Sequence, residues 1–433
     1  MISRVDTPTA DESSRTWLGL DLQRHRWIFP LAGTLTTFVR GAATFTFSLL
    51  ILPLEKELGW TRPETVTAFS VYSLVVALGL FLGGVLVDRL GPKIPLVLGT
   101  ILVAAAHLLL SNVGSITGFV LSYGVMMALG VALASAAATY ALAARWYPMP
   151  SERGLALGVS IMGIGFGGLV AVPLWQLGFD ALGWRSTVLI TGGVYTVVLL
   201  FVTSVARFPS VEMQTEPVTG DMNLQEAILT RRFWVIVLLL FLSVMSGMII
   251  ASQVYPMFTE SVETPWALTT TIAAAGVVVQ AICNSLARPM WGWIHGKVGV
   301  RTAQSLSCLA VAAGLVILAT ARPEEFGPGT YGLLPLVGIG LVGLGMGGCV
   351  TLTAVVTAAS FGASFFARTI GLVTLLGAGT AGFLGPWIGA LLRQRTGDYD
   401  VALYVGASLA ALAFVLALLM LPAQGEEKIE GAW

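Results

Sequence analysis

The sequence predicts an all-α membrane protein with twelve transmembrane helices, arranged as two related bundles of six. First, hydrophobic residues make up 56% of the 433 residues and charged residues only 11%, whereas soluble domains carry about 25% charged residues. Second, long apolar runs alternate with short charged stretches. Third, a glycine and basic motif recurs after about half the chain. Because lipid cannot satisfy backbone polar groups, apolar runs of this length are expected to be helical.

Twelve apolar runs are long enough to cross a membrane, which takes about 20 residues. They are 27–53, 66–87, 94–112, 117–144, 154–178, 185–206, 233–257, 267–294, 302–320, 331–360, 368–392 and 400–422. One such run could be a buried helix of a soluble protein, but twelve in series argue strongly against a soluble fold. Runs 154–178 and 368–392 are rich in glycine, which favours close helix packing.

The runs divide the chain into five parts. We expect a cytoplasmic tail at 1–26, a first bundle at 27–206, a cytoplasmic linker at 207–232, a second bundle at 233–422 and a cytoplasmic tail at 423–433. The first tail has no short apolar segment with a cleavage site, so no signal peptide is expected. We expect a protein of the plasma (inner) membrane with both termini on the cytoplasmic side. In this orientation the inner loops show a modest excess of basic residues, although Arg393 and Arg395 in an outer loop count against it.

Two loops repeat the same pattern 208 positions apart, each between the second and third runs of its half. The shared positions are Gly84, Arg89, Gly91 and Lys93 in the first loop, and Gly292, Lys297, Gly299 and Arg301 in the second. A looser similarity links Arg153 and the run to Pro173 with Arg368 and the run to Pro386. Chance similarity of glycine-rich helices is the alternative, but the basic positions also match. Paired halves are typical of secondary transporters, whose substrate binds near the midplane between them.

The first loop, residues 84–93, resembles the motif between helices 2 and 3 of the major facilitator superfamily. The resemblance implies that Asp88 takes part in gating, by pairing with an arginine of helix 4 and with the N-terminus of helix 11. In this chain these are Arg145 and the segment that opens at Arg368. An acid at a helix N-terminus is also favourable on its own account. The second loop has Gly296 in place of Asp88, so the contact is expected only in the first half; a charge that merely sets topology is the alternative.

Within the superfamily, the chain is most similar to the monocarboxylate porter and oxalate/formate antiporter group. The similar motifs are 58–62 (LGWTR), 145–148 (RWYP), 153–158 (RGLALG) with Gly163 and Gly167, 232–234 (RFW), and Arg288 with 292–293 (GW). Three positions depart from the group. Gln253 stands where many members have histidine, Asn284 stands where mammalian-type porters have aspartate, and 369–392 lacks the lysine of oxalate carriers.

Two arginines inside apolar runs are the strongest candidates for chemistry. Arg40 lies 13 residues into the first run, or about 20 Å along a helix, near the middle of a core about 30 Å thick. Arg288 lies about one turn before the inner loop. An unpaired charge at this depth costs at least about 2.5–3.5 kcal/mol and tends to face a water-filled cavity. No Asp or Glu lies in the middle of a run, and arginine keeps its proton and suits carboxylates, so a bound anion would supply the missing charge.

Polar residues at helical spacing extend both arginine sites. Thr37 and Thr44 share a face with Arg40, Gln280 and Asn284 precede Arg288 at four-residue intervals, and Ser246 and Gln253 are seven residues apart. We expect Arg288 to clamp a carboxylate with help from Asn284 and Gln253, and Arg40 to bind a second carboxylate or attract the anion. The alternatives are that Arg40 bonds to carbonyls of a neighbouring helix, that Arg288 is structural, and that the amides only join helices.

These observations predict a monomeric secondary carrier of small mono- or dicarboxylates that works by rocker-switch alternating access, with proton symport or anion exchange. A carrier of a neutral solute or drug and a non-transporting receptor are the alternatives. No enzyme, metal or cofactor is expected, because the chain has no zinc-protease, Walker or catalytic-serine motif. The 23 basic and 23 acidic residues balance, so no nucleic acid is expected. His107 lies among apolar residues and is expected to be packed rather than to relay protons.

Overall fold

The computed structural model describes residues 16–17, 20–22, 24–135, 142, 146–147, 150–208, 222, 224–259, 270–320, 333–361 and 366–421. Within these ranges the regular structure is helical, apart from strands β1 (Thr16–Trp17) and β2 (Leu20–Asp21), which pair antiparallel. The two strands lie in the predicted first tail.

The helices before the central linker are α2 (Ile28–Leu58), α3 (Arg62–Leu90), α4 (Lys93–Ser111), α5 (Ile116–Phe119), the π-helix η1 (Val120–Met127), α6 (Ala128–Ser135), α8 (Pro150–Leu182) and α9 (Trp184–Val205). Those after it are α10 (Leu224–Ile228), α11 (Arg231–Ala251), α12 (Val254–Thr259), α13 (Thr270–Thr320), α14 (Leu333–Phe361), α15 (Phe366–Thr374), the π-helix η4 (Leu375–Gly379), α16 (Thr380–Thr396) and α17 (Asp400–Met420).

Among the described residues, 11 helical segments are long and apolar enough to cross a membrane. One of them, α13, has 51 residues, and at about 1.5 Å per residue it exceeds twice the roughly 30 Å core. Gly299 interrupts α13 with a non-helical backbone. The two parts of α13 are therefore separate crossings, which gives the twelve helices that the sequence predicts.

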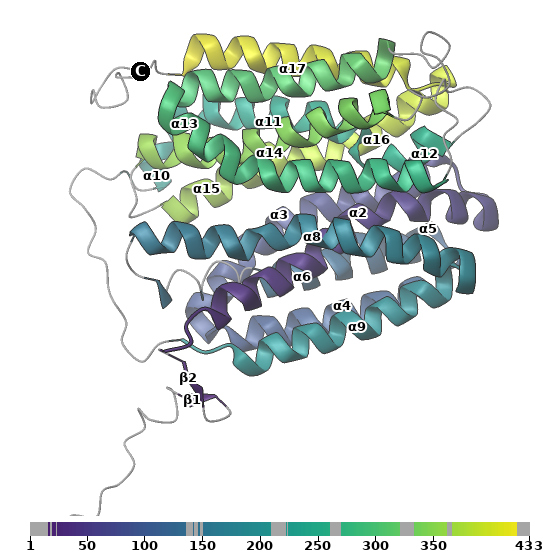
Figure 1. Ribbon diagram of the computed structural model, residues 1–433, viewed down its shortest axis with the longest axis horizontal. Helices are drawn as coiled ribbons and strands as arrows, with labels where there is room; N and C mark the ends of the chain where they lie inside the picture. The colour runs from purple at the N-terminus through teal and green to yellow at the C-terminus, as the bar shows by residue number, and fades with distance from the viewer. Residues whose placement is uncertain are drawn as a thin grey trace, which may run out of the picture.

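The crossings form two bundles that lie against each other, the first made by α2 to α9 and the second by α11 to α17 (Figure 1). Helices of both bundles run along the long axis of the view. Strands β1 and β2, α10 and α15 lie at one end of the molecule, and α5 and α12 lie at the other. We call these the Gly91 end and the Gly59 end, after glycines in the turns found there.

Small residues bring the two bundles together on two helix pairs. Where α3 meets η4 and α16, a methyl group added at Gly382 of α16 would lie 2.7 Å from the Cβ atom of Ser73, and one at Gly379 of η4 would lie 2.9 Å from that of Ala77. Where α8 meets α13, a methyl group at Gly165 would lie 2.5 Å from the Cβ atom of Ser285. Helices can approach this closely only where a glycine leaves room for the facing backbone.

The two copies of the sequence repeat adopt the same backbone conformation at their central glycine. Gly91 has φ 76° and ψ 174°, and Gly299 has φ 78° and ψ 164°. This region is essentially restricted to glycine, since a Cβ atom would clash with the backbone. Both glycines let the chain turn from one crossing into the next, so the repeat has a structural basis at this position.

Replacing Gly91 with alanine should lower the free energy of unfolding by about 1–3 kcal/mol, because alanine is strained in this conformation. A methyl group at Gly91 would meet nothing within 4 Å, so the effect isolates the backbone term. Gly84 is a matched control, since it lies in the same helix, also faces open space and has no positive φ. Thermal unfolding in detergent measures both variants, and equal melting temperatures would contradict the prediction.

Two predicted spans differ from the structure. The fourth crossing comprises α5, η1 and α6 over 116–135, and most of the remaining predicted stretch to 144 lies outside the described residues. The seventh crossing does not continue to 257, because α11 ends at Ala251 and a turn at Ser252 and Gln253 precedes α12.

Candidate functional site

Arg40 lies in the interior of α2 (Ile28–Leu58), and its side chain is only partly exposed. Its Nη1 atom is buried and has no hydrogen-bond partner. Among the described residues, no carboxylate forms an ion pair with this guanidinium. A permanent cation thus lies inside a membrane crossing, and no carboxylate of the described residues neutralises it.

Two hydroxyl groups lie beside Arg40. The Thr44 hydroxyl donates to the Arg40 carbonyl oxygen at 2.9 Å, and the Tyr72 hydroxyl of α3 lies 3.2 Å from the Thr44 oxygen. Tyr72 also reaches the Arg40 carbonyl at 3.4 Å, and its ring lies 5.1 Å from that of Tyr123 between centroids. Nothing in the sequence singles out Tyr72, because one neutral aromatic residue in an apolar run gives no signal of its own.

Helix contacts place the first part of α13 at the same depth as Arg40, on the other bundle. A methyl group at Gly168 of α8 would touch both Phe45 of α2 and Ala281 of α13. Gly165, three residues earlier, faces Ala281 and Ser285. Phe45 is little more than one turn beyond Arg40, so the polar stripe of α13 lies across the bundle interface from it.

The stripe of α13 contains the residues that the sequence singled out. Gln280 is 3% exposed, and its Oε1 atom has no hydrogen-bond partner. Asn284 and Arg288 are partly exposed, and Arg288 lies one turn further toward the Gly91 end. The carbonyl oxygens of Gln280 and Asn284 face Gly343 and Gly347 of α14, which lets α14 support this stretch closely.

Gln253 does not lie on the same helix face as Ser246, although the seven-residue spacing predicted that it would. It sits in the turn after α11, fully buried, with its Nε2 atom 3.2 Å from the Ile249 carbonyl and its Oε1 atom without a partner. It packs beside Gly389 of α16. Gly382 of the same helix faces Ser73, next to Tyr72, so Gln253 lies about 10 Å further toward the Gly59 end than Tyr72.

Two other polar positions are occupied by packing contacts. The Thr37 hydroxyl donates to the Ser160 carbonyl of α8 at 2.5 Å, so it joins two helices of the first bundle. The Ser246 hydroxyl bonds to the Ser243 carbonyl, and the Ser246 backbone faces Gly406 of α17. The predicted face shared by Ser246 and Gln253 was wrong, because the helix breaks between them.

Part of the predicted gating contact lies outside the described residues. Arg145 lies outside the described residues. The backbones of Asp88, Arg153 and Arg368 are described and are helical, but their side chains are not described. The contact of Asp88 with Arg145 and the start of α15 stays a prediction. Arg89, Lys93 and Lys297 are exposed at the Gly91 end and Arg301 is partly exposed there, with the Lys297 ammonium 3.6 Å from the Trp293 ring centroid. Gly84 and Gly292 face open space.

His107 is packed, as predicted. Its Nδ1 atom lies 2.9 Å from the Val103 carbonyl, its ring meets Tyr195 edge to face, and its side chain covers Gly192. All these partners belong to α4 and α9. The residue is therefore part of the first bundle's interior and lies away from the interface with α13.

Comparison with known proteins agrees with this architecture. The chain is 26% identical to the oxalate:formate antiporter of Oxalobacter formigenes over 411 residues, or 93% of each chain. It is 25% identical to mouse (Mus musculus) monocarboxylate transporter 11 over 390 residues, which cover 86% of this chain and 84% of that one. The crystal structure of a D-xylose-proton symporter has the same fold, with a TM-score of 0.71 at 17% identity over 92% of this chain and 99% of that one.

A sequence model of the Major Facilitator Superfamily matches residues 33–342, well over half of the chain. This match runs without interruption from α2 in the first bundle to the start of α14 in the second, so it includes both loops of the repeat. The protein is a membrane transporter by fold and by its relatives, and the chain belongs to the Major Facilitator Superfamily.

Proposed function

We propose that this protein is a secondary active transporter of small organic anions, mono- or dicarboxylates, that works by alternating access between the two bundles. The observation that carries the proposal is the Arg40 guanidinium, which lies inside a membrane crossing without a carboxylate partner among the described residues. A carboxylate would neutralise this charge and accept two parallel hydrogen bonds from its planar fork. The names of the relatives, an oxalate:formate antiporter and a monocarboxylate transporter, support the same class of substrate.

The surrounding groups suit a carboxylate that lies between the bundles. The Tyr72 hydroxyl lies on the Arg40 side, and its single proton can turn from the Thr44 oxygen to an anion, while the Thr44 proton stays on the Arg40 carbonyl. The Gln280 amide lies on the facing helix α13, where its unpartnered oxygen can be complemented by a donor on the substrate or by water. Arg288 and Asn284 extend this face toward the Gly91 end and could hold a second carboxylate.

We infer that coupling is anion exchange. An empty carrier would have to close around an uncompensated guanidinium, which is costly in a medium of low dielectric constant. A bound carboxylate removes that cost, so the loaded carrier should change sides faster than the empty one. Proton symport is the competing mode, and it requires that a proton travel with the substrate.

We also propose that the Gly91 end faces the cytoplasm, with both termini on that side, and that the monomer is the functional unit. Arg89, Lys93 and Lys297 are exposed at the Gly91 end, together with the partly exposed Arg301. Basic residues in short loops favour the cytoplasmic side. This orientation makes the Gly59 end the outer end.

Counterflow in proteoliposomes tests the function. Vesicles loaded with unlabelled oxalate or formate should take up the labelled anion many times faster than empty vesicles, and a pH gradient should change the rate little. Uptake that requires a pH gradient and no internal anion would show proton symport instead. Uptake of a labelled nucleoside or sugar but not of either anion would overturn the substrate class, and saturable binding without uptake would indicate a receptor.

A further inference from the structure

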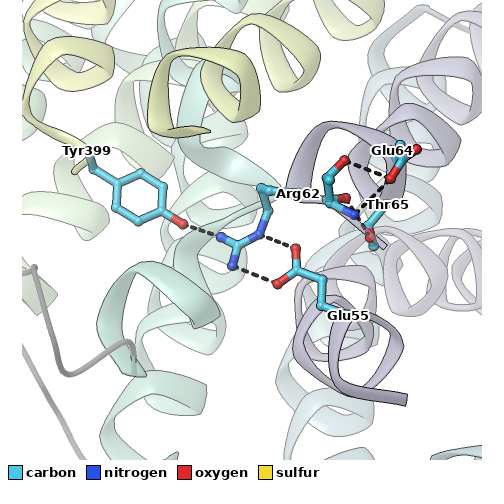
Figure 2. A network of polar contacts seen from close by, with 6 residues as sticks. Glu55, Arg62, Glu64, Thr65 and Tyr399 are labelled. Atoms are coloured by element: carbon cyan, nitrogen blue, oxygen red, sulfur yellow. Dashed lines mark hydrogen bonds and ion pairs between the residues drawn. The ribbon is translucent and has the colours of Figure 1, made fainter. Parts of the chain in front are cut away.

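A network of polar contacts joins the two bundles at the Gly59 end (Figure 2). Arg62, the first residue of α3, is held by Glu55 of α2 through two bonds, Nε to Oε1 at 2.5 Å and Nη2 to Oε2 at 3.0 Å. The remaining Nη1 donates to the Tyr399 hydroxyl, just before α17. Glu55 and Arg62 belong to the first bundle and Tyr399 to the second, so the tyrosine bond is the one of these three bonds that crosses between the bundles.

The turn between α2 and α3 fixes the position of Arg62. Gly59 ends α2 in the left-handed conformation, at φ 70°. Thr61 and Glu64 then form a capping box, in which the Glu64 carboxylate accepts from the Thr61 backbone N–H at 2.8 Å. The Arg62 side chain is only 9% exposed and lies beside Tyr399, which is 2% exposed. The two bonds to Glu55 thus orient the guanidinium from within its own bundle.

A second network at the same end has the same construction. The Gln176 amide of α8 donates from Nε2 to both carboxylate oxygens of Asp180, at 3.2 and 3.3 Å. Its Oε1 atom therefore points away from Asp180, and it accepts from the Tyr255 hydroxyl of α12 at 2.9 Å. Again a carboxylate of the first bundle orients a polar side chain of that bundle, and a tyrosine of the second bundle completes the contact.

We propose that the hydroxyls of Tyr399 and Tyr255 form the state-dependent latch that closes the Gly59 end during the transport cycle, while Glu55 and Asp180 act as positioning residues. The proposal rests on the alternating access proposed above. When the bundles separate at this end, the Glu55–Arg62 and Asp180–Gln176 contacts stay intact, because both partners of each move together. Opening therefore breaks the tyrosine bonds and leaves no acid of these pairs without its partner.

This arrangement makes the closed end easy to release. Breaking an ion pair that bridged the bundles would leave two uncompensated charges, whereas a tyrosine hydroxyl can exchange its partner for water. The Tyr255 bond joins neutral groups and should shift the ratio of open to closed molecules by about two- to tenfold, whereas the Tyr399 bond to a charged guanidinium should shift it by about 10- to 100-fold. Two such bonds hold the closed state well enough to populate it and weakly enough to let it open.

The experiment measures the distance across the Gly59 end by pulsed electron spin resonance. Spin labels are placed at Asn112 in the first bundle and Thr270 in the second, both exposed, in a chain whose Cys283, Cys308 and Cys349 are replaced by alanine. Relative to the parent, Tyr255→Phe should raise the ratio of molecules at longer to shorter distances by about two- to tenfold and Tyr399→Phe by about 10- to 100-fold, and the double variant should exceed both.

Tyr404→Phe is the matched control, because Tyr404 lies in α17 near Tyr399 but is exposed on the helix surface. Its distance distribution should equal the parent's. An unchanged distribution in the double variant would overturn the latch. If the double variant is not recovered folded, the two single variants decide in the same way. The distances require no substrate, so a chain that shows the shift but transports no anion would contradict the proposed substrate and leave the latch standing.

Discussion

Replacing Arg40 with glutamine should reduce anion exchange by at least 10- to 100-fold and leave the fold intact. Hydrogen bonds to charged groups contribute about 1.5–3 kcal/mol each, and loss of one such bond corresponds to this range. Glutamine keeps a polar side chain of moderate length but removes the permanent charge and the planar fork. The variant should lose counterflow of labelled oxalate or formate in proteoliposomes, since the anion then has no neutralising partner on the first bundle.

Arg40→Lys separates charge from geometry. Lysine keeps the positive charge but cannot form two parallel hydrogen bonds with one carboxylate. We expect intermediate exchange, with a raised KM and a smaller loss of maximal rate than in the glutamine variant. Arg395→Gln is the control, because Arg395 lies exposed in the last turn of α16 and should leave counterflow unchanged.

The opposite result has a definite meaning. If Arg40→Gln exchanged anions at the parental rate, Arg40 would be a packing residue whose charge is stabilised by hydrogen bonds to backbone carbonyls or water. The site would then have to be built around Arg288 and Asn284 on α13 alone. Unfolding of the variant is distinguished from loss of binding by gel filtration and thermal unfolding in the same detergent.

The number and order of crossings follow from the sequence, because one physical constraint dominates. A charge or an unsatisfied backbone group is costly in lipid, so apolar runs and the loops between them are visible without knowledge of packing. The repeat around Gly91 and Gly299 was equally visible, since only glycine adopts the backbone that both turns require. The break at Ser252 and Gln253 was not predicted. Pro256 removes the helical hydrogen bond to the Ser252 carbonyl, but Pro173 and Pro386 lie inside helices that continue, so a proline alone does not locate a break.

The site was predictable only in the polar members that stand out within apolar runs. Arg40 and Gln280 are conspicuous in apolar runs, and the structure places them on facing helices at a similar depth. Tyr72 contributes through contacts with residues about 30 positions away, which no local pattern reveals. Thr37 shares a helix face with Arg40, yet its hydroxyl contacts Ser160 of α8, because helical spacing does not say which neighbour packs where.

The proposed latch was even less predictable from the sequence than the binding site. The contact between Arg62 and Tyr399 joins turns that are 337 positions apart. Similarity to known motifs highlighted Arg62 as part of 58–62 but gave it no partner. Contacts that form between bundles depend on the whole fold, so they become visible only in three dimensions.

Replacing Gly167 with alanine should destabilise the first bundle by about 1–3 kcal/mol, the usual cost of an extra methyl group in a tightly packed interior. The added Cβ atom would overlap the Phe38 carbonyl oxygen and the Ala42 nitrogen of α2. Both are backbone atoms, so no side-chain rotation relieves the clash and the two helices must move apart. The melting temperature in detergent should fall clearly below that of the parent.

Gly193→Ala provides the comparison, since Gly193 lies in the middle of α9, is exposed and would meet nothing within 4 Å. Alanine favours a helix over glycine by about 1 kcal/mol, so this variant should be unchanged or slightly more stable. Equal melting temperatures for the two variants would show that α2 and α8 are not in direct backbone contact. Since Gly165 and Gly168 on another face of α8 meet α13 in the same way, small residues let this one helix support Arg40's helix and still reach the second bundle.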